Sequence, residues 1–166
     1  MKIEVNPLDV TSIDRAIGKL EDYAKSLDRK ADELCMKLAS MGATNVSLGF
    51  SRLLYVGDAD VSVSVEKTGE NEYSIIASGE TVLIAEFGAG VKYGGGHPLN
   101  AEFGTGPGTY PGQKNAMNPN GWWLPREKTG GTPTKSYGNA PTMAMYNTGK
   151  DLRKEILAVA KEVFQT

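Results

Sequence analysis

The chain has 166 residues, the usual size of one domain, and we expect a single domain over residues 1–166. Its 40% hydrophobic and 23% charged residues are typical of a globular domain and exclude a wholly disordered or collagen-like chain. The net charge of −2 disfavours a dedicated nucleic-acid binder, and no apolar run approaches the roughly 18 residues of a membrane span.

The N-terminus and the cysteine content bear on the compartment. Residues 1–7 contain no apolar run, so we expect no secretory signal. Cys35 is the only cysteine and cannot form an intrachain disulfide, which fits assembly in a reducing cytoplasm.

A long helix is predicted first. Apolar residues recur there in a heptad pattern with alternating spacings of four and three: Ile13, Ile17, Leu20, Ala24, Leu27, Ala31, Leu34, Leu38 and Met41. Thr11 or Ser12 is the expected N-cap, and Gly42 is expected to follow the last helical turn. A helix of about 30 residues would be roughly 45 Å long, so it either crosses the domain or projects from it. It could lie across a sheet, or pack against a helix of another subunit.

Strands are predicted next. Residues 46–50, continuing to Leu54 and Val56, and residues 61–65 alternate apolar with polar side chains. Residues 67–71 form the expected hairpin loop, and residues 73–77 the returning strand. Residues 82–85 could be strand or helix. A long helix followed by an antiparallel meander predicts an α+β fold.

Glycine and proline are concentrated in residues 88–141, which hold 13 of the 20 glycines and 7 of the 8 prolines. We expect residues 88–120 to be a flexible loop or an assembly arm. Residues 121–125 and 134–137 are predicted to form a second hairpin with its tip at 128–132. A C-terminal helix should begin near Thr142 or Lys150, with one apolar face formed by Leu152, Ile156, Val159, Ala160 and Val163.

No catalytic, cofactor or metal site is expected. The glycine runs at 88–90 and 104–108 do not open a helix, as a phosphate-binding loop requires. His97 is the only histidine, and we expect it to cap a loop turn. Asp58 and Asp60 are expected to flank a solvated turn rather than to bind calcium. The segment from 44 to 87 has two basic and seven acidic residues, which predicts an acidic sheet surface.

One hexapeptide occurs twice. Residues 85–90 read Ala-Glu-Phe-Gly-Ala-Gly, and residues 101–106 read Ala-Glu-Phe-Gly-Thr-Gly. Each copy places a carboxylate and an aromatic ring before two glycines that permit positive φ. The two copies could be equivalent structural turns, or a contact surface presented to a partner.

Trp122 and Trp123 cannot both be buried in one core, because adjacent strand residues point to opposite faces. An exposed tryptophan favours an oligomer interface. Together with Tyr93, Tyr110 and Tyr137, the pair could instead stack on a glycan.

Several of these segments resemble, in chain order, the head–tail joining or tail-completion proteins of long-tailed bacteriophages. The family's Glu-Phe-Gly-Thr-Gly turn is matched by residues 102–106 and, with one change, by 86–90. Its Gly-Trp-aromatic segment is matched by 121–123, and its run into the last helix by 138–143. Residues 107–119 look like an insertion, and both copies of the turn stay open as the family turn.

The resemblance implies a non-enzymatic virion protein that forms a homo-oligomeric ring, hexameric, at the neck or tail of a siphovirus-type phage. It implies other neck and tail proteins as partners, DNA that passes through without specific binding, no membrane, and host cytoplasm during assembly. The acidic segment would then face the channel. The interface candidates are Glu86, Phe87, Gly88, Glu102, Phe103, Gly104, Thr105, Trp122, Trp123 and Met143.

Two other function classes stay open. One is a tail-tip module that binds cell-surface glycan through Trp122, Trp123 and the nearby tyrosines. The other is a small hydrolase that uses Glu86 or Glu102, although no spacing in the sequence pairs two carboxylates.

Overall fold

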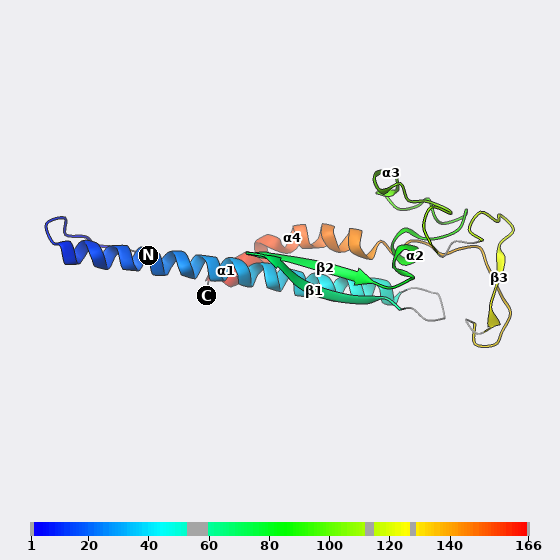
Figure 1. Ribbon diagram of the computed structural model, residues 1–166, viewed down its shortest axis with the longest axis horizontal. Helices are drawn as coiled ribbons and strands as arrows, with labels where there is room; N and C mark the ends of the chain where they lie inside the picture. The colour runs from blue at the N-terminus through cyan, green and yellow to red at the C-terminus, as the bar shows by residue number, and fades with distance from the viewer. Residues whose placement is uncertain (1, 53–59, 112–114, 127–128, 166) are drawn as a thin grey trace.

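The computed structural model describes residues 2–52, 60–111, 115–126 and 129–165. The fold is α+β: a long N-terminal helix, two small antiparallel hairpins and a C-terminal helix. The molecule is elongated, with the glycine-rich segment gathered at one end of the long helix (Figure 1).

Helix α1 spans Val10–Ser51 and is longer at both ends than predicted. Asp9 is its N-cap in place of Thr11 or Ser12, because its carboxylate accepts the N–H of Thr11 at 3.0 Å. The expected end at Gly42 was wrong, since this glycine is buried inside the helix facing Ile75 and Leu152.

The strand predicted at residues 46–50 is therefore the last part of α1. Val46 and Phe50 are buried one helical turn apart, whereas Leu48 is 57% exposed. An apolar residue at every second position also fits a helix that buries positions i and i+4, so the alternation misled the prediction. Leu54 and Val56 lie outside the described residues.

The first predicted hairpin is confirmed. Strand β1, Ser62–Gly69, pairs antiparallel with β2, Glu72–Ser78, and Val63 lies opposite Ala77. Among the residues that the structure describes, this sheet has two strands rather than a meander. One face packs on α1, and the apolar core joins Val46, Phe50, Ala85 and Ala144 to side chains of the hairpin.

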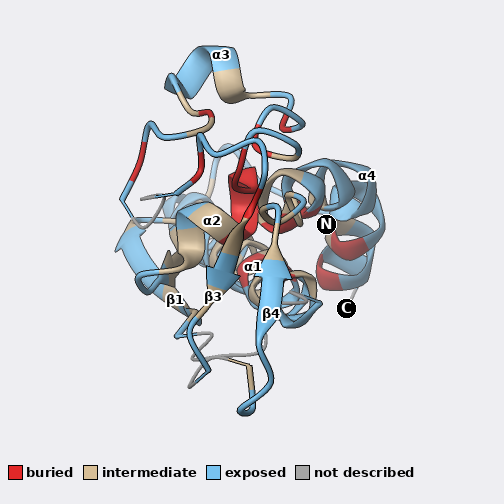
Figure 2. Ribbon diagram, turned by 90° about the vertical axis from the view of Figure 1, so that its right-hand side faces the viewer, coloured by how far each residue is buried: buried red, intermediate tan, exposed pale blue. Residues whose placement is uncertain are grey.

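Residues 82–85, left open between strand and helix, belong to helix α2, Val82–Phe87. The Asp60 carboxylate fixes the turn before α2 by accepting the backbone N–H of Glu80 and of Thr81. The bond from Glu80 foremost, and then a hydrogen bond from the Thr81 hydroxyl, lower the pKa of Asp60. Asp60 thus caps a turn, as expected, whereas Asp58 lies outside the described residues. Figure 2 shows buried residues beside α2, beneath the loops.

The second predicted hairpin is also confirmed. Strand β3, Trp122–Leu124, pairs with β4, Thr134–Ser136.

Helix α4, Ala144–Gln165, begins between the two predicted starts and runs back along α1, where Lys37 contacts Glu162. On its predicted face Val159 and Val163 are buried, whereas Ile156 is 45% exposed. A short helix α3, Asn100–Phe103, was not predicted.

Two glycines of α1 provide a test of this packing. A Cβ at Gly49 would lie 2.6 Å from Ala144 Cβ and 3.1 Å from its Cα, whereas Gly18 has no neighbour within 4 Å. We expect Gly49→Ala to lower the free energy of unfolding by about 1–3 kcal/mol through overpacking. Gly18→Ala should raise it by about 0.5–1 kcal/mol, because alanine favours the helix. Urea unfolding measures both, and equal effects at the two sites would contradict the packing of α1 on α4.

Candidate functional site

The first copy of the repeated hexapeptide is the buried centre of the glycine-rich end. All six of residues 85–90 are buried, and the Glu86 side chain is only 7% exposed. One carboxylate oxygen of Glu86 accepts the N–H of Met145 at 2.9 Å, and the other accepts the N–H of Tyr146 at 3.0 Å. These are the free backbone donors of the first turn of α4, which a carboxylate both caps and stabilises electrostatically.

His97 completes this cluster. It does cap a turn, as expected, because its Nδ1 accepts the N–H of Leu99 at 3.1 Å. Nδ1 therefore carries no proton, and Nε2–H donates to Glu86 at 3.2 Å. The ring is buried 4.4 Å from the Phe87 ring and 5.5 Å from that of Tyr146. The histidine expected to cap a loop turn is thus also part of a satisfied buried network.

Backbone hydrogen bonds fasten the same turn to the segment before α4. Ala89 and Asn139 exchange N–H to carbonyl bonds at 2.8 and 2.9 Å. The Thr142 N–H and hydroxyl both donate to the carbonyl of Ala85. Gly88 is needed here: its φ is 78°, and a Cβ would lie 2.8 Å from the Asn139 carbonyl oxygen. The structure therefore joins residues 86–90 to 138–143.

Met143, an interface candidate, lies within this clamp. Its N–H donates to the carbonyl of Glu86 at 3.3 Å, and its φ of 54° is unusual for a residue other than glycine. This backbone conformation costs free energy, which the bonds around Glu86 offset. The role that the structure gives Met143 is to turn the chain into α4.

The second copy of the hexapeptide has a different environment, so the two copies are not equivalent turns. Glu102 is exposed and Phe103 is 60% exposed. Gly104, with φ 61°, ends helix α3, and Thr105 donates its hydroxyl to Asn100. The Phe103 ring lies 6.1 Å from that of Phe87 and so joins the buried cluster to the surface.

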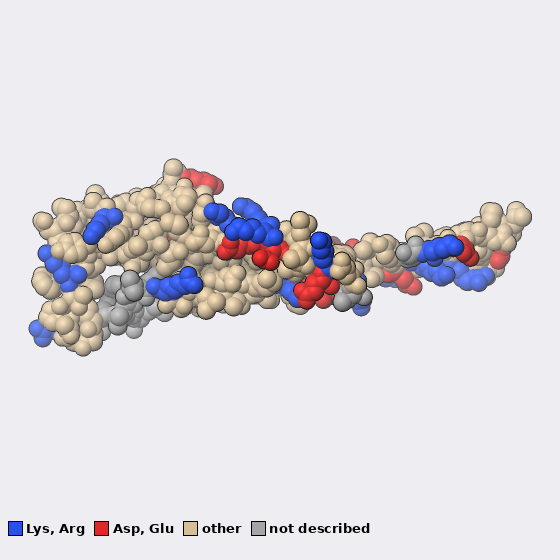
Figure 3. Space-filling model, turned by 180° about the vertical axis from the view of Figure 1, so that it is seen from behind, with Lys and Arg blue, Asp and Glu red and all other residues tan. Residues whose placement is uncertain are grey.

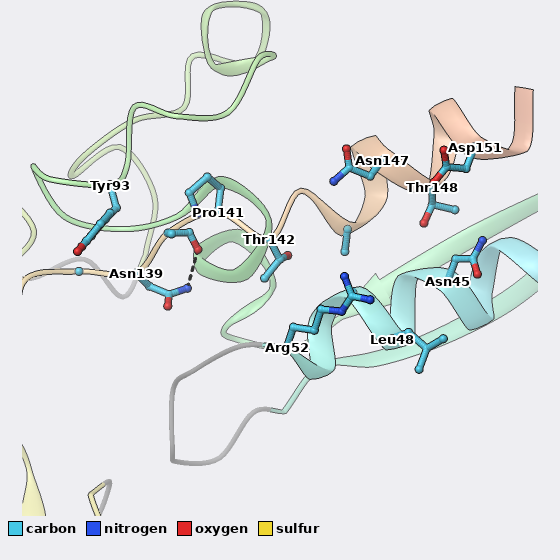
Figure 4. Close-up of a pocket in the computed structure, with 14 residues that line it drawn as sticks. Asn45, Leu48, Arg52, Tyr93, Asn139, Pro141, Thr142, Asn147, Thr148 and Asp151 are labelled. Carbon is cyan, nitrogen blue, oxygen red and sulfur yellow. Dashed lines mark hydrogen bonds between the residues drawn. The ribbon is translucent and has the colours of Figure 1, made fainter. Parts of the chain in front are cut away.

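Two hollows flank this region. An apolar one of about 370 Å³ lies beside Phe87 and Phe103 and is also lined by Leu83, Leu99 and Tyr146. A larger groove of about 670 Å³ separates the end of α1 from the start of α4 (Figure 4). Polar side chains such as Arg52, Asn139 and Asp151 line this groove together with apolar ones such as Leu48 and Pro141.

The tryptophan pair lies on β3. Trp122 is half-buried and Trp123 is 66% exposed, as the alternation of a strand requires. Trp123 lies opposite Lys135, whose ammonium is 5.5 Å from the Tyr137 ring. Lys92 contacts the same ring at 5.8 Å, which makes an exposed aromatic and basic face. Tyr110, by contrast, is buried, which raises its pKa to about 12 and places it outside that face.

Comparison of the chain with family models, with curated proteins and with solved structures found no match. Within the described ranges, no three His, Cys, Asp or Glu side chains are grouped so that they could hold a metal ion. Among the described helices, none has the length and apolarity needed to span a bilayer.

Of the predicted site residues, the structure therefore brings together Glu86, Phe87, Gly88, Phe103 and Met143. Glu102, Gly104 and Thr105 lie on or next to α3, and Trp122 and Trp123 on the second hairpin. Sequence reasoning missed the contact between Glu86 and His97. The fact that this carboxylate precedes a glycine turn was visible, but its partners lie 11 and about 60 residues away in the chain.

The repeated hexapeptide supplies a matched pair of variants. Glu86→Ala should lower the free energy of unfolding by about 3 kcal/mol, because it leaves the N–H groups of Met145 and Tyr146 without their acceptor. Glu102→Ala, at the corresponding exposed position, should change it by less than about 0.5 kcal/mol. Chemical denaturation followed by circular dichroism gives both values. Equal losses would contradict a role for Glu86 as the cap of α4.

Proposed function

We propose that the chain is a structural virion protein, a ring subunit of the neck or of the tail-completion complex of a siphovirus-type phage. The observation that carries this proposal is a group of large apolar side chains exposed in the segment that follows the 86–90 turn. Phe103, Met117 and Trp123 are 60%, 67% and 66% exposed, whereas the turn itself is buried and bonded to α4. Large apolar side chains that remain exposed are typical of a protein interface.

The chemistry of the buried cluster supports a non-enzymatic role. Glu86 and His97 are the residues that hydrolytic chemistry would use. Both are buried, and the carboxylate and both ring nitrogens are engaged in hydrogen bonds that hold α4 and the turn at residues 97–99. A general acid or base has to exchange a proton with substrate, and although both residues line the apolar hollow, their polar atoms are engaged in these structural hydrogen bonds. We therefore propose no catalytic activity.

The resemblance to tail-completion proteins supports the particular assembly. Two of its segments, 86–90 and 138–143, are hydrogen-bonded neighbours, and the segment with Trp122 and Trp123 lies at the same end of the molecule. A ring subunit uses two different surfaces, one toward each neighbour. We propose a hexameric ring that contacts other neck and tail proteins.

Charge is consistent with a channel that passes DNA without binding it. The acidic segment is split: Glu86 is buried, whereas Glu66, Glu70 and Glu72 are exposed on the first hairpin. Such carboxylates repel phosphate groups. Figure 3 shows acidic and basic side chains mixed along the middle of the molecule, and basic ones at the end that carries β3 and β4. We propose that the hairpin carboxylates face the channel.

Deletion of the gene in its phage tests the proposal. We expect heads and tails to accumulate unjoined, or tails to remain incomplete, and the wild-type chain supplied in trans to restore infectious particles. Electron microscopy of lysates, with gold labelling of a tagged chain, gives the location. Intact infectious particles without the chain would overturn the proposal.

The exposed face around Trp123 favours one second candidate, a tail-tip module that binds cell-surface glycan. Aromatic side chains such as Trp123 and Tyr137 present the flat apolar surface on which a sugar ring can stack. In that case the parent protein binds isolated cell wall, and Trp123→Ala loses about tenfold in affinity, or about 1.4 kcal/mol. Pull-down with cell walls measures this, with Met117→Ala as an exposed control outside the tryptophan strand. No binding by the parent protein would remove this candidate.

A further inference from the structure

The N-terminal half of α1 carries an apolar stripe that extends beyond the first hairpin and α4. Lys67 and Tyr73 of the first hairpin contact α1 at Asp32, and Glu162 near the end of α4 contacts it at Lys37. Toward its N-terminus α1 projects beyond both elements (Figure 1). The stripe on the projecting part consists of Ile13, Ile17, Leu20, Ala24 and Leu27, and the four large side chains in it are 36–54% exposed.

The stripe continues a packed surface rather than ending at solvent. Its next members, Ala31, Leu34 and Leu38, are partly buried where the hairpin and α4 lie along α1. The apolar side chains that recur every four and three residues thus make contacts within the subunit at one end of α1, and they are exposed at the other end. This 3.5-residue repeat is the one that lets two helices pack along their whole length.

Charge beside the stripe selects the direction in which a second helix can lie. With Leu20 and Leu27 at heptad position d, the flanking e positions are Asp14, Glu21 and Asp28, all acidic and all exposed. The g positions on the other flank are Ala16, Tyr23 and Lys30, which carry no acid; Ala16 is buried within its own subunit, whereas Tyr23 is exposed.

The energy of a pair of such segments therefore depends on whether the two helices run parallel or antiparallel. In an antiparallel pair the e positions of one helix lie beside the e positions of the other, so the acidic columns would repel. In a parallel pair each e position lies beside a g position, which places Asp28 near Tyr23 and Glu21 near Ala16 of the other copy. Only the parallel arrangement buries the stripe without bringing like charges together.

We propose that this stripe, Ile13 to Leu27, packs in parallel against the same segment of neighbouring copies of this chain. Ala24 in the stripe permits close approach of the helices. Subunits around one axis have their helices in the same direction, so parallel packing fits a closed ring. The inference deepens the proposed function and rests on it, because it names the surface and orientation through which the ring subunits meet.

Cysteine cross-linking of the full-length protein tests both surface and direction. In a Cys35→Ser background, Leu20→Cys and Leu27→Cys are prepared singly, with Asp22→Cys on the opposite face of α1 as control. A disulfide needs Cα atoms within about 7 Å, so under mild oxidation both stripe variants should link to themselves about tenfold faster than the control. No antiparallel pair brings both positions opposite their own copies.

A second variant shows whether the stripe carries association. Ile17→Ser combined with Leu20→Ser should shift the native mass of the assembly to smaller species, with little change in helical circular dichroism because both side chains are exposed in the single subunit. Asp22→Ser is the control and should leave the mass unchanged. An unchanged mass in the stripe variant would overturn the proposal.

Each remaining result is also decisive. Disulfides that form only when Leu20→Cys and Leu27→Cys are mixed would mean antiparallel packing and overturn the proposal. An assembled protein that links at neither position would overturn it as well, but would leave the ring function to another surface. A monomer would overturn it too, and the deletion phenotype in the phage would then decide the function separately.

Discussion

The glycine-rich end of the molecule depends on one carboxylate, that of Glu86. Its two oxygens accept the first free N–H groups of α4, and His97 donates to one of them. Without this cap, burying the start of a 22-residue helix beside a glycine turn would leave several backbone donors unsatisfied. Together with the backbone hydrogen bonds between Ala89 and Asn139 and from Thr142 to Ala85, this cap holds the turn at 86–90 against the start of α4.

The other main feature of the structure is the small size of its apolar core. Most of α1 and the two hairpins bury one face only, and the fully buried apolar cluster is small, formed by Val46, Phe50, Ala85 and Ala144. Large apolar side chains remain exposed at both ends, on the projecting half of α1 and around Trp123. A subunit that completes its core by association has this distribution of exposed apolar side chains.

The sequence predicted those elements whose signals are local. The heptad stripe gave α1, and the alternation from Val61 to Val65 with the turn at Asn71 gave the first hairpin. Residues 46–50 were predicted wrongly because alternate and helical spacings coincide over five residues. The difference between the two hexapeptides could not be predicted, since their local sequences are nearly identical. Only contacts far along the chain, from Ala89 to Asn139 and from Glu86 to α4, bury one copy and leave the other exposed.

The most direct test of the proposed assembly role is the mass of the complex that this chain forms, measured on the purified protein and on material released from particles of the proposed phage. The account predicts one closed species whose mass is an integral multiple of the 17.8 kDa chain. The mass of a single chain in both samples would contradict it, because the exposed stripe of α1 and the surface around Trp123 would then have no partner to cover them.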